Sequence, residues 1–266
     1  MKSLILNIIL LISGSYIVIC ALLYFFQERM IFFPEKLERD YVFGFDQDFE
    51  EINVKAKDGT LINGLLFKAD SSKGLIFYLH GNAGSLRSWG RVAAAYTGMN
   101  YDVFILDYRG YGKSEGTISS EEQFYGDVQS AYDEIKKRYS ESDIIILGYS
   151  IGSAPAAKLA STNNPAMLIL QAPFYNMWDI VKQRLPVIPP FLLKYKFFVN
   201  EFVKNSKMQV IIFHGDLDEV IYYGSSLKLK NEFKPQDTLI TLSGQTHNGM
   251  TDNPDYLTAV RKILEK

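Results

Sequence analysis

The fold of this chain is decided by Asp143-Ile-Ile-Ile-Leu-Gly-Tyr-Ser-Ile-Gly-Ser-Ala-Pro-Ala-Ala157. Ile144 to Leu147 form an unbroken apolar run, which is typical of a strand buried on both faces of a parallel sheet. Gly148-Tyr-Ser-Ile-Gly152 follows at once, and the small residues from Ser153 to Ala160 favour a helix. In such a G-x-S-x-G sequence a sharp turn lifts the serine clear of the sheet, and the glycines remove side chains that would clash. We therefore predict that Ser150 is a nucleophile.

The composition limits the class of protein. A chain of 266 residues has room for one α/β domain of ordinary size and a short extension. With 47% hydrophobic and 22% charged residues it can build a substantial core. The net charge of -2 and the lack of a basic block argue against a nucleic-acid partner. Cys20 is the only cysteine, which excludes an intramolecular disulfide and argues against cysteine chemistry.

An apolar segment near the N-terminus predicts one transmembrane helix. Leu4 to Phe26 contains no charged residue, and this length at 1.5 Å per residue spans about 30 Å of hydrocarbon. A cleavable signal peptide is the alternative, but it would have a shorter apolar core and a small-residue cleavage site. We expect residues 1–27 to be a retained membrane anchor. Lys and Arg residues around the segment lean weakly toward a cytoplasmic catalytic domain, and the side of the membrane stays open.

The remaining chain divides into a juxtamembrane segment, 28–49, and a folded domain, 50–266. In the former, Phe32 and Phe33 lie either at the membrane interface or under the domain. Glu50 to Phe67 contains two alternating stretches around Lys57-Asp-Gly-Thr60, which predicts an antiparallel hairpin. Apolar strands then alternate with helical segments, which predicts an α/β fold with a doubly wound, mostly parallel sheet. The strands are expected at Leu75–Leu79, Val103–Leu106, Ile144–Leu147, Met167–Leu170, Val210–Phe213 and Leu239–Leu242, and the helices near Ser85–Tyr96, Ser120–Arg138, Ile151–Ala160, Tyr223–Phe233 and Pro254–Lys266.

One apolar insertion, at about 174–205, interrupts this alternation. It contains several prolines and many aromatic and aliphatic side chains. Such a segment can be a small lid over the carboxyl ends of the strands, where it would line an acyl-binding pocket. Ordinary packing on the domain is the alternative, and both stay open. Trp178 in the insertion and Tyr149 beside the nucleophile are candidate substrate contacts.

A serine hydroxyl needs a base within hydrogen-bond reach and an acid that orients this base. Of the three histidines, His80 and His214 each end an apolar strand, as structural histidines often do. His247 lies in a polar loop just after the last strand and is the predicted base. Asp216 and Asp218 follow the preceding strand, and both qualify as the acid by position. The carboxyl ends of parallel strands converge on one crevice, so residues distant in sequence can meet there.

The negative oxygen that forms during attack on a carbonyl needs two N–H donors. We predict that one is the backbone of Ile151, directly after the nucleophile. The other is expected from the glycine-flanked turn His80-Gly-Asn-Ala-Gly84, and Asn82 is the predicted donor.

Taken together, these motifs resemble the α/β-hydrolase superfamily, and more narrowly its membrane-anchored, single-span serine hydrolases. The matching pieces run from about residue 50 to the C-terminus and are His80–Gly84, Asp107-Tyr-Arg-Gly-Tyr-Gly-Lys-Ser114, Gly148–Gly152, His214-Gly-Asp-Leu-Asp218 and His247. The resemblance implies the α/β-hydrolase fold, with Ser150 as nucleophile and His247 as base. It favours Asp218 over Asp216 as the acid, because the family's acid follows His-Gly after two residues. It also implies that the segment from Asp107 is structural, and it names no substrate.

Other chemistries fit the sequence poorly. Gly112-Lys-Ser114 lacks the glycine-rich lead-in of a phosphate-binding loop, so we expect no nucleotide. The histidines end separate strands, so we expect no metal, and no cofactor is implied. We expect a membrane-anchored serine hydrolase that cleaves carboxylic esters or thioesters of acyl or lipid-like substrates. The alternative is a catalytically inactive binding or scaffold protein on a hydrolase fold.

Overall fold

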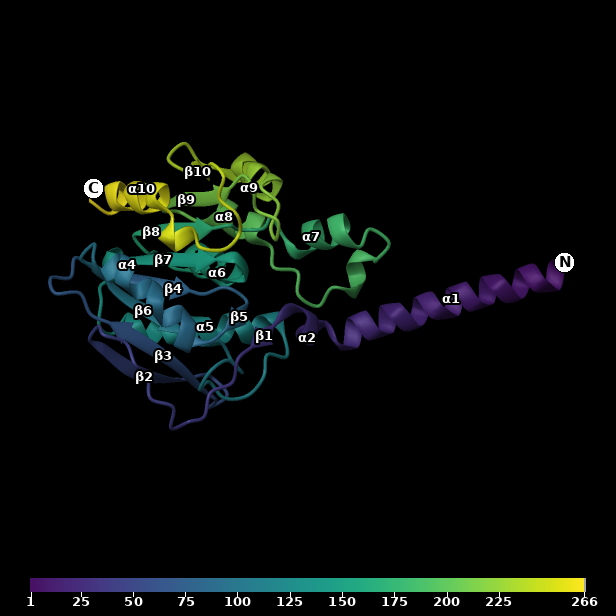
Figure 1. The fold of residues 1–266 in the computed structure, drawn as a ribbon, viewed down its shortest axis with the longest axis horizontal. Coiled ribbons are helices and arrows are strands. Elements are labelled where there is room, and N and C mark those ends of the chain that lie inside the picture. Colours follow the sequence, from purple (N-terminus) through teal and green to yellow (C-terminus); the bar gives the residue numbers. More distant parts are fainter. Residues whose placement is uncertain (266) are drawn as a thin grey trace.

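A long N-terminal helix and a layered α/β domain make up residues 1–265, the part of the chain that the computed structural model describes (Figure 1). Within these residues the main sheet has eight strands in the order β10-β9-β8-β7-β4-β6-β3-β2. Its strands are β2 (Phe49–Lys55), β3 (Leu61–Phe67), β4 (Leu75–Leu79), β6 (Asp102–Leu106), β7 (Ile144–Tyr149), β8 (Met167–Gln171), β9 (Gln209–Gly215) and β10 (Thr238–Leu242). Two short strands, β1 (Phe33–Pro34) and β5 (Ala83–Gly84), pair with each other in a separate sheet. The expected α/β-hydrolase fold is confirmed.

The hairpin and the parallel sheet form as the alternation predicts. β2 and β3 pair antiparallel, with Phe49 opposite Phe67, and β3 joins β6 in the same sense. From β6 to β10 every pairing is parallel. All carboxyl ends of these parallel strands therefore meet at one edge, which is where the predicted site residues were expected.

Helices cover both faces of the sheet. The α-helices are α1 (Lys2–Phe25), α2 (Gln27–Ile31), α3 (Leu86–Trp89), α4 (Ala93–Thr97), α5 (Glu121–Ile135), α6 (Ser153–Thr162), α7 (Met177–Arg184), α8 (Val199–Asn205), α9 (Gly224–Leu229) and α10 (Pro254–Leu264). Short 3-10 turns are η1 (Gly90–Val92), η2 (Glu141–Asp143), η3 (Ser150–Gly152), η4 (Pro190–Leu192), η5 (Lys230–Glu232) and η6 (Met250–Asp252). Lys266, the last residue of the expected C-terminal helix, lies outside the described residues.

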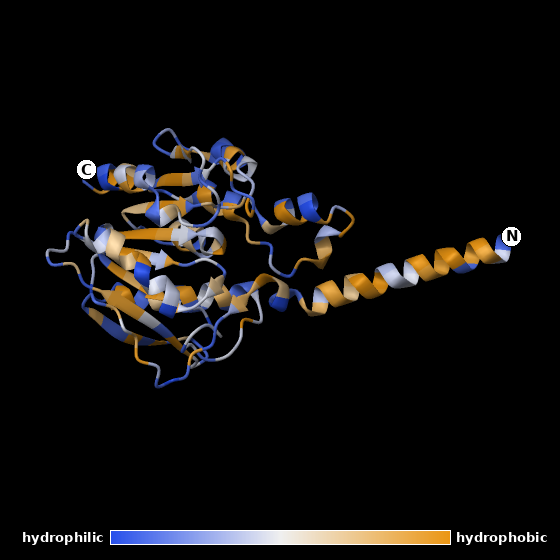
Figure 2. Ribbon diagram, in the orientation of Figure 1, coloured by the Kyte–Doolittle hydropathy of each residue, from blue (hydrophilic) through white to orange (hydrophobic). Residues whose placement is uncertain are grey.

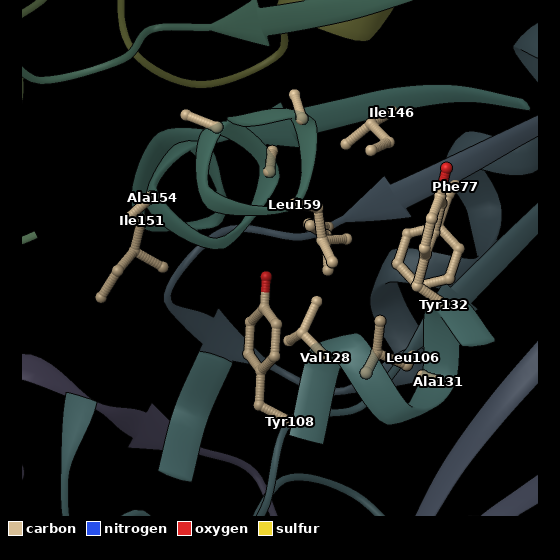
Figure 3. Packing of buried hydrophobic residues seen from close by; sticks show 14 of the residues in the cluster. Phe77, Leu106, Tyr108, Val128, Ala131, Tyr132, Ile146, Ile151, Ala154 and Leu159 are labelled. Atoms are coloured by element: carbon tan, nitrogen blue, oxygen red, sulfur yellow. The ribbon is translucent and has the colours of Figure 1, made fainter. Parts of the chain in front are cut away.

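The core lies on both sides of the sheet because successive side chains of a strand point to opposite faces. Phe77 of β4 belongs to the side that α5 and α6 cover, and Tyr78 belongs to the side of α4 and α10. Figure 3 shows the first side, where Leu159 of α6 and Val128 of α5 lie between the strands and Tyr108. Strands buried on both faces explain their continuous apolar sequences.

The helix expected over 85–96 is broken into α3, η1 and α4. Gly90 lies at the break, and a Cβ at this position would meet the ring of Phe45 at 2.3–2.9 Å. Glycine favours a helix interior less than any residue except proline, so the local sequence weakens the helix where Phe45 packs. The backbone stays right-handed helical through this segment, so the expected helix is present with a 3-10 turn in its middle.

The insertion combines both alternatives. In its second half, Tyr195, Phe197 and Val199 are buried in the main core, as ordinary packing requires. In its first half, α7 and the following loop project from the domain toward α1 (Figure 1), and Val187 and Phe191 are 70% and 80% exposed. Only this first half has the position of a lid.

The N-terminal helix α1 is apolar along its length (Figure 2) and none of its residues is buried. Its length and composition would allow it to span a membrane. Directly after α1 in the chain, the buried side-chain amide of Gln27 donates to the carbonyl of Leu192 at 2.9 Å and accepts from the N–H of Lys194 at 2.8 Å. Phe32 packs on the domain, as one of the two alternatives requires, and Phe33 is 54% exposed.

The turn from β7 into α6 packs closely against the end of β4. Ser150 has φ 53°, a left-handed conformation that is costly for a residue with a side chain. A Cβ on Gly152 would meet the carbonyl oxygens of Leu79 and His80 at 2.1 and 2.7 Å, so only glycine fits. The turn can therefore form only if the start of α6 lies directly against the end of β4.

Replacing Gly152 by alanine should be strongly destabilising. Because the new methyl group would overlap backbone atoms of β4, we expect the free energy of unfolding of Gly152→Ala to fall by about 3 kcal/mol. The matched control is Gly126→Ala, because a Cβ at Gly126 in α5 meets nothing within 4 Å. The control should gain about 0.5–1 kcal/mol from higher helix propensity. Denaturant unfolding in detergent measures both, and equal midpoints would contradict the steric argument.

Candidate active site

Three side chains from three strand ends form one hydrogen-bonded row. Ser150 follows β7, Asp218 follows β9 and His247 follows β10. The Nε2 of His247 lies 3.0 Å from the Oγ of Ser150, and its Nδ1 lies 2.7 Å from the Oδ2 of Asp218. All three residues are at most 8% exposed. The structure thus brings together the predicted nucleophile, base and acid.

The row fixes the proton on the imidazole of His247. Its Nδ1 faces a carboxylate, which can only accept, so Nδ1 carries the proton. The Nε2 atom then has a lone pair directed at the hydroxyl of Ser150, which donates to it. This is the protonation state that a general base needs. Tyr149 holds the same residue through its hydroxyl, which donates to the carbonyl of His247 at 2.5 Å.

Asp218 is held as a carboxylate by its surroundings. Burial alone would raise its pKa, but hydrogen bonds with His214 and His247 outweigh this and lower the pKa below its ordinary value. The Oδ1 atom also accepts from the N–H groups of Val220 and Ile221, at 2.9 and 2.8 Å. These donors orient the carboxylate, so that its Oδ2 remains directed at His247.

Asp216, the other acid that the position allowed, has a different role. Its Oδ1 accepts from the N–H of Gly244 at 2.7 Å and so ties the loop after β9 to the loop after β10. The choice of Asp218 that the family resemblance implied therefore agrees with the geometry. The two histidines set aside, His80 and His214, are fully buried.

The expected donors for a negative oxygen both border the nucleophile. Asn82 and Ile151 line the same cavity as Ser150. The side chain of Asn82 is already engaged, because its Oδ1 accepts from the hydroxyl of Tyr111 at 3.1 Å and from the N–H of Phe33 at 3.3 Å. These contacts fix the side-chain oxygen of Asn82, and the predicted role of Asn82 as an N–H donor stays a prediction.

Asp107 stabilises the end of the loop that contains Asn82, where α3 begins. It is buried, and its Oδ1 accepts from the N–H of Leu86 at 2.9 Å, at the start of α3. Burial raises the pKa of Asp107 well above its ordinary value. These contacts agree with the structural role that the resemblance implies.

A cavity of about 340 Å³ opens over Ser150. Most of its lining is apolar, and it comprises Met30, Ile31, Gly81, Asn82, Ala83, Trp89, Tyr149, Ser150, Ile151, Phe174, Met177, Ile180, Val220, Ile221, His247 and Asn248. Tyr149, a predicted substrate contact, is among them. A site of this kind suits an apolar group next to a reactive carbonyl.

Trp178, the other predicted contact, lies on α7 but is not part of this lining. The neighbouring residues Met177 and Ile180 line the cavity instead. Residues three apart share one side of a helix, whereas the next residue along points about 100° away. The sequence identified the correct segment, but the phase of the helix selects other side chains.

Sequence reasoning missed Met30 and Ile31, which come from the juxtamembrane segment. Their apolar character was visible in the run Met30-Ile-Phe-Phe33. No local pattern indicated that this run packs beside Ser150, which is more than a hundred residues away in the sequence.

The comparisons with known proteins agree with this architecture. A family model described as serine aminopeptidase, S33, matches residues 70–209. Protein bem46 of Schizosaccharomyces pombe is 31% identical over 189 residues, which cover 66% of this chain and 63% of that protein. Alpha/beta hydrolase domain-containing protein 17C of Mus musculus is 30% identical over 205 residues, which cover 74% and 61%. The chain thus matches less than two thirds of the length of these two relatives.

Solved structures show the same fold at low sequence identity. An esterase of Pyrococcus furiosus superimposes with a TM-score of 0.70 at 16% identity, over 88% of this chain and 97% of that one. At this identity the likeness concerns the fold.

Exchanging each candidate acid for its amide should separate their roles. In Asp218→Asn the amide can donate to Nδ1 of His247 and stabilise the wrong tautomer, so we expect kcat/KM for an ester to fall by about 10³–10⁴. Asp216→Asn, the matched control, should change kcat/KM by less than about threefold because its side chain contacts only a loop. Steady-state kinetics of the purified variants test this, and equal losses would assign Asp216 to the site.

The lowered pKa of Asp218 also predicts a pH dependence of stability. The ordinary pKa of an aspartate in the unfolded chain is about 3.9, and the pKa of Asp218 in the folded chain is lower. At pH values between the two, the unfolded chain binds more protons, so the stability that this carboxylate contributes is lost as the pH falls. We expect the unsubstituted chain to exceed Asp218→Asn in free energy of unfolding above pH 5. This difference should shrink progressively below pH 4. Urea unfolding at pH 7 and pH 3 measures it, and a constant difference would be inconsistent with the shift.

Proposed function

The chain belongs to the α/β-hydrolase superfamily, and we propose that it is a membrane-anchored serine hydrolase of acyl esters. The observation that carries this proposal is the hydrogen-bonded row of Ser150, His247 and Asp218 at the floor of an apolar cavity. The esterase names of several structural neighbours, including the one from Pyrococcus furiosus, are consistent with this chemistry.

In the first half of the proposed reaction, the Oγ of Ser150 attacks the acyl carbonyl while its proton passes to Nε2 of His247. The negative carbonyl oxygen is bound by the backbone N–H groups of Ile151 and Asn82. Asp218 stabilises the imidazolium that forms. The tetrahedral species then collapses, the C–O bond to the alcohol breaks, and His247 gives its proton to the leaving alkoxide.

In the second half, water replaces the alcohol. His247 takes a proton from this water, and the resulting hydroxide attacks the acyl-enzyme carbonyl. Collapse of the second tetrahedral species returns the proton to Ser150 and releases the carboxylic acid. The same base thus acts twice, and no other proton carrier is needed.

The lining of the cavity favours an acyl ester over a peptide substrate. An aminopeptidase must bind the charged α-amino group of its substrate, for which a carboxylate is the natural partner. Among the described residues that line the cavity over Ser150, none is Asp or Glu. The apolar side chains of Phe174, Met177 and Ile180 suit a hydrocarbon chain instead.

The apolar helix α1 supports placing this chemistry at a membrane. A domain fixed beside a bilayer meets lipid-like esters at high local concentration. Both features favour an acyl or lipid-like substrate over a soluble polar one. The competing proposal is a catalytically inactive binding protein, but such a descendant would be expected to lack one member of the row, and here all three are in place.

Hydrolysis of p-nitrophenyl esters by the full chain in detergent tests the proposal. We expect activity in the unsubstituted chain and a loss of about 10⁴-fold or more in Ser150→Ala, because the nucleophile is removed. Ser153→Ala is the matched control, since this buried serine of α6 lies outside the cavity lining. It should keep its activity within about threefold.

Labelling with a fluorophosphonate probe distinguishes the inactive alternative. The unsubstituted chain should be labelled and Ser150→Ala should not. If the unsubstituted chain neither hydrolyses any ester of the series nor reacts with the probe, the binding-protein alternative is favoured.

A further inference from the structure

The cavity over Ser150 adjoins a second one on the side of the anchor. This outer cavity has a volume of about 170 Å³. Met30, Ile31 and Met177 line both, so these three side chains form the partition between them. Two of the three are methionines, whose unbranched side chains change rotamer readily. The partition can therefore open for a ligand without movement of the backbone.

The outer cavity is apolar and is built from two parts of the chain that are far apart in sequence. Its remaining lining is Leu23, Gln27, Val181, Leu185, Ile188, Leu192 and Leu193. Leu23 belongs to the last turn of α1, so this helix itself supplies one wall. The amide of Gln27 is satisfied by Leu192 and Lys194, so it adds no unpaired polar group.

Side chains of α7 line this path in a regular order. Met177 and Ile180 border the cavity over Ser150, and Met177 and Val181 border the outer one together with Leu185, which directly follows α7. Met177, Ile180 and Val181 recur three and four residues apart, which places them on one side of the helix. A single apolar stripe thus leads from the nucleophile to the anchor.

We propose that the two cavities form one channel for the long acyl chain of a bilayer lipid ester, with the end of the membrane anchor as part of its wall. This inference rests on the proposed hydrolase function and specifies its substrate. The ester carbonyl lies at Ser150, and the tail runs past Met30 and Met177 toward Leu23. An acyl chain is the expected occupant because the channel is apolar, begins at the nucleophile and ends at a helix fit for a bilayer.

A third cavity indicates the orientation of the lipid. It has a volume of about 760 Å³, shares Ala83, Trp89, Tyr149 and Asn248 with the cavity over Ser150, and includes polar and charged residues. It lies along α4 and α10, which Figure 1 shows on the side of the domain remote from α1. In the proposed orientation the tail of the lipid points toward the membrane and its polar part lies in the third cavity, on the other side of Ser150.

The test compares a long and a short ester in matched variants. The full chain is reconstituted in phosphatidylcholine nanodiscs and assayed with p-nitrophenyl palmitate and p-nitrophenyl butyrate. Leu23→Trp narrows the channel from the anchor, and Leu22→Trp, whose side chain lies outside the lining, is its control. Val181→Trp and Val187→Trp form the same pair within the insertion. The readout is the ratio of kcat/KM for palmitate to that for butyrate.

We expect this ratio to fall at least about tenfold in Leu23→Trp and Val181→Trp, because each methylene kept out of the channel loses about fourfold in binding. In Leu22→Trp and Val187→Trp the ratio should stay within about twofold. Labelling by a small fluorophosphonate shows that each variant is folded, since the probe needs only the inner cavity.

Two results would overturn the channel. One is an unchanged ratio in both lining variants while labelling persists, and the other is an equal fall in lining and control variants. Failure of the underlying hydrolase function has a different signature. In that case the unsubstituted chain would hydrolyse neither ester and would not be labelled.

Discussion

The close contact between the β7–α6 turn and the end of β4 is the constraint on which the rest of the structure depends. Gly152 lies so near the carbonyl oxygens of Leu79 and His80 that no side chain fits between them. Ser150, two residues earlier in the same turn, has a left-handed conformation, and its hydroxyl reaches Nε2 of His247. The close contact also brings the backbone of Ile151 next to the loop that contains Asn82. One steric requirement therefore positions the nucleophile and both expected N–H donors.

The parallel sheet delivers the other groups to the same place. β8 separates β7 from β9, and β10 follows β9 in the same parallel sheet, so the loops after β9 and β10 bring Asp218 and His247 to Ser150 at the same edge. Burying a carboxylate is costly unless its hydrogen bonds are satisfied. Here the N–H groups of Val220 and Ile221 and two imidazoles satisfy them. The acid thus remains charged in a place where charge is otherwise unfavourable.

The juxtamembrane segment is physically joined to the site. β1 pairs with β5, so Phe33 lies opposite Ala83, and the N–H of Phe33 reaches the side chain of Asn82. Gln27 ties the same segment to the insertion through two backbone groups. Contacts at both the loop of Asn82 and the insertion fix the cavity over Ser150 relative to the segment that follows α1. They would give the proposed acyl channel a defined path toward α1.

The sequence by itself determined the elements whose signals are local. Continuous apolar runs indicated the buried strands, the G-x-S-x-G pattern from Gly148 to Gly152 indicated Ser150, and the polar loop after the last strand indicated His247. Only the tertiary structure decided which side chains point into the site, because a local sequence pattern carries no information about contacts between distant segments. The direction of each carboxylate separated Asp218 from Asp216, and the phase of α7 placed Met177 rather than Trp178 at the cavity. Met30 reached the site only because distant segments pack together, and such packing depends on contacts between residues that no sequence window includes.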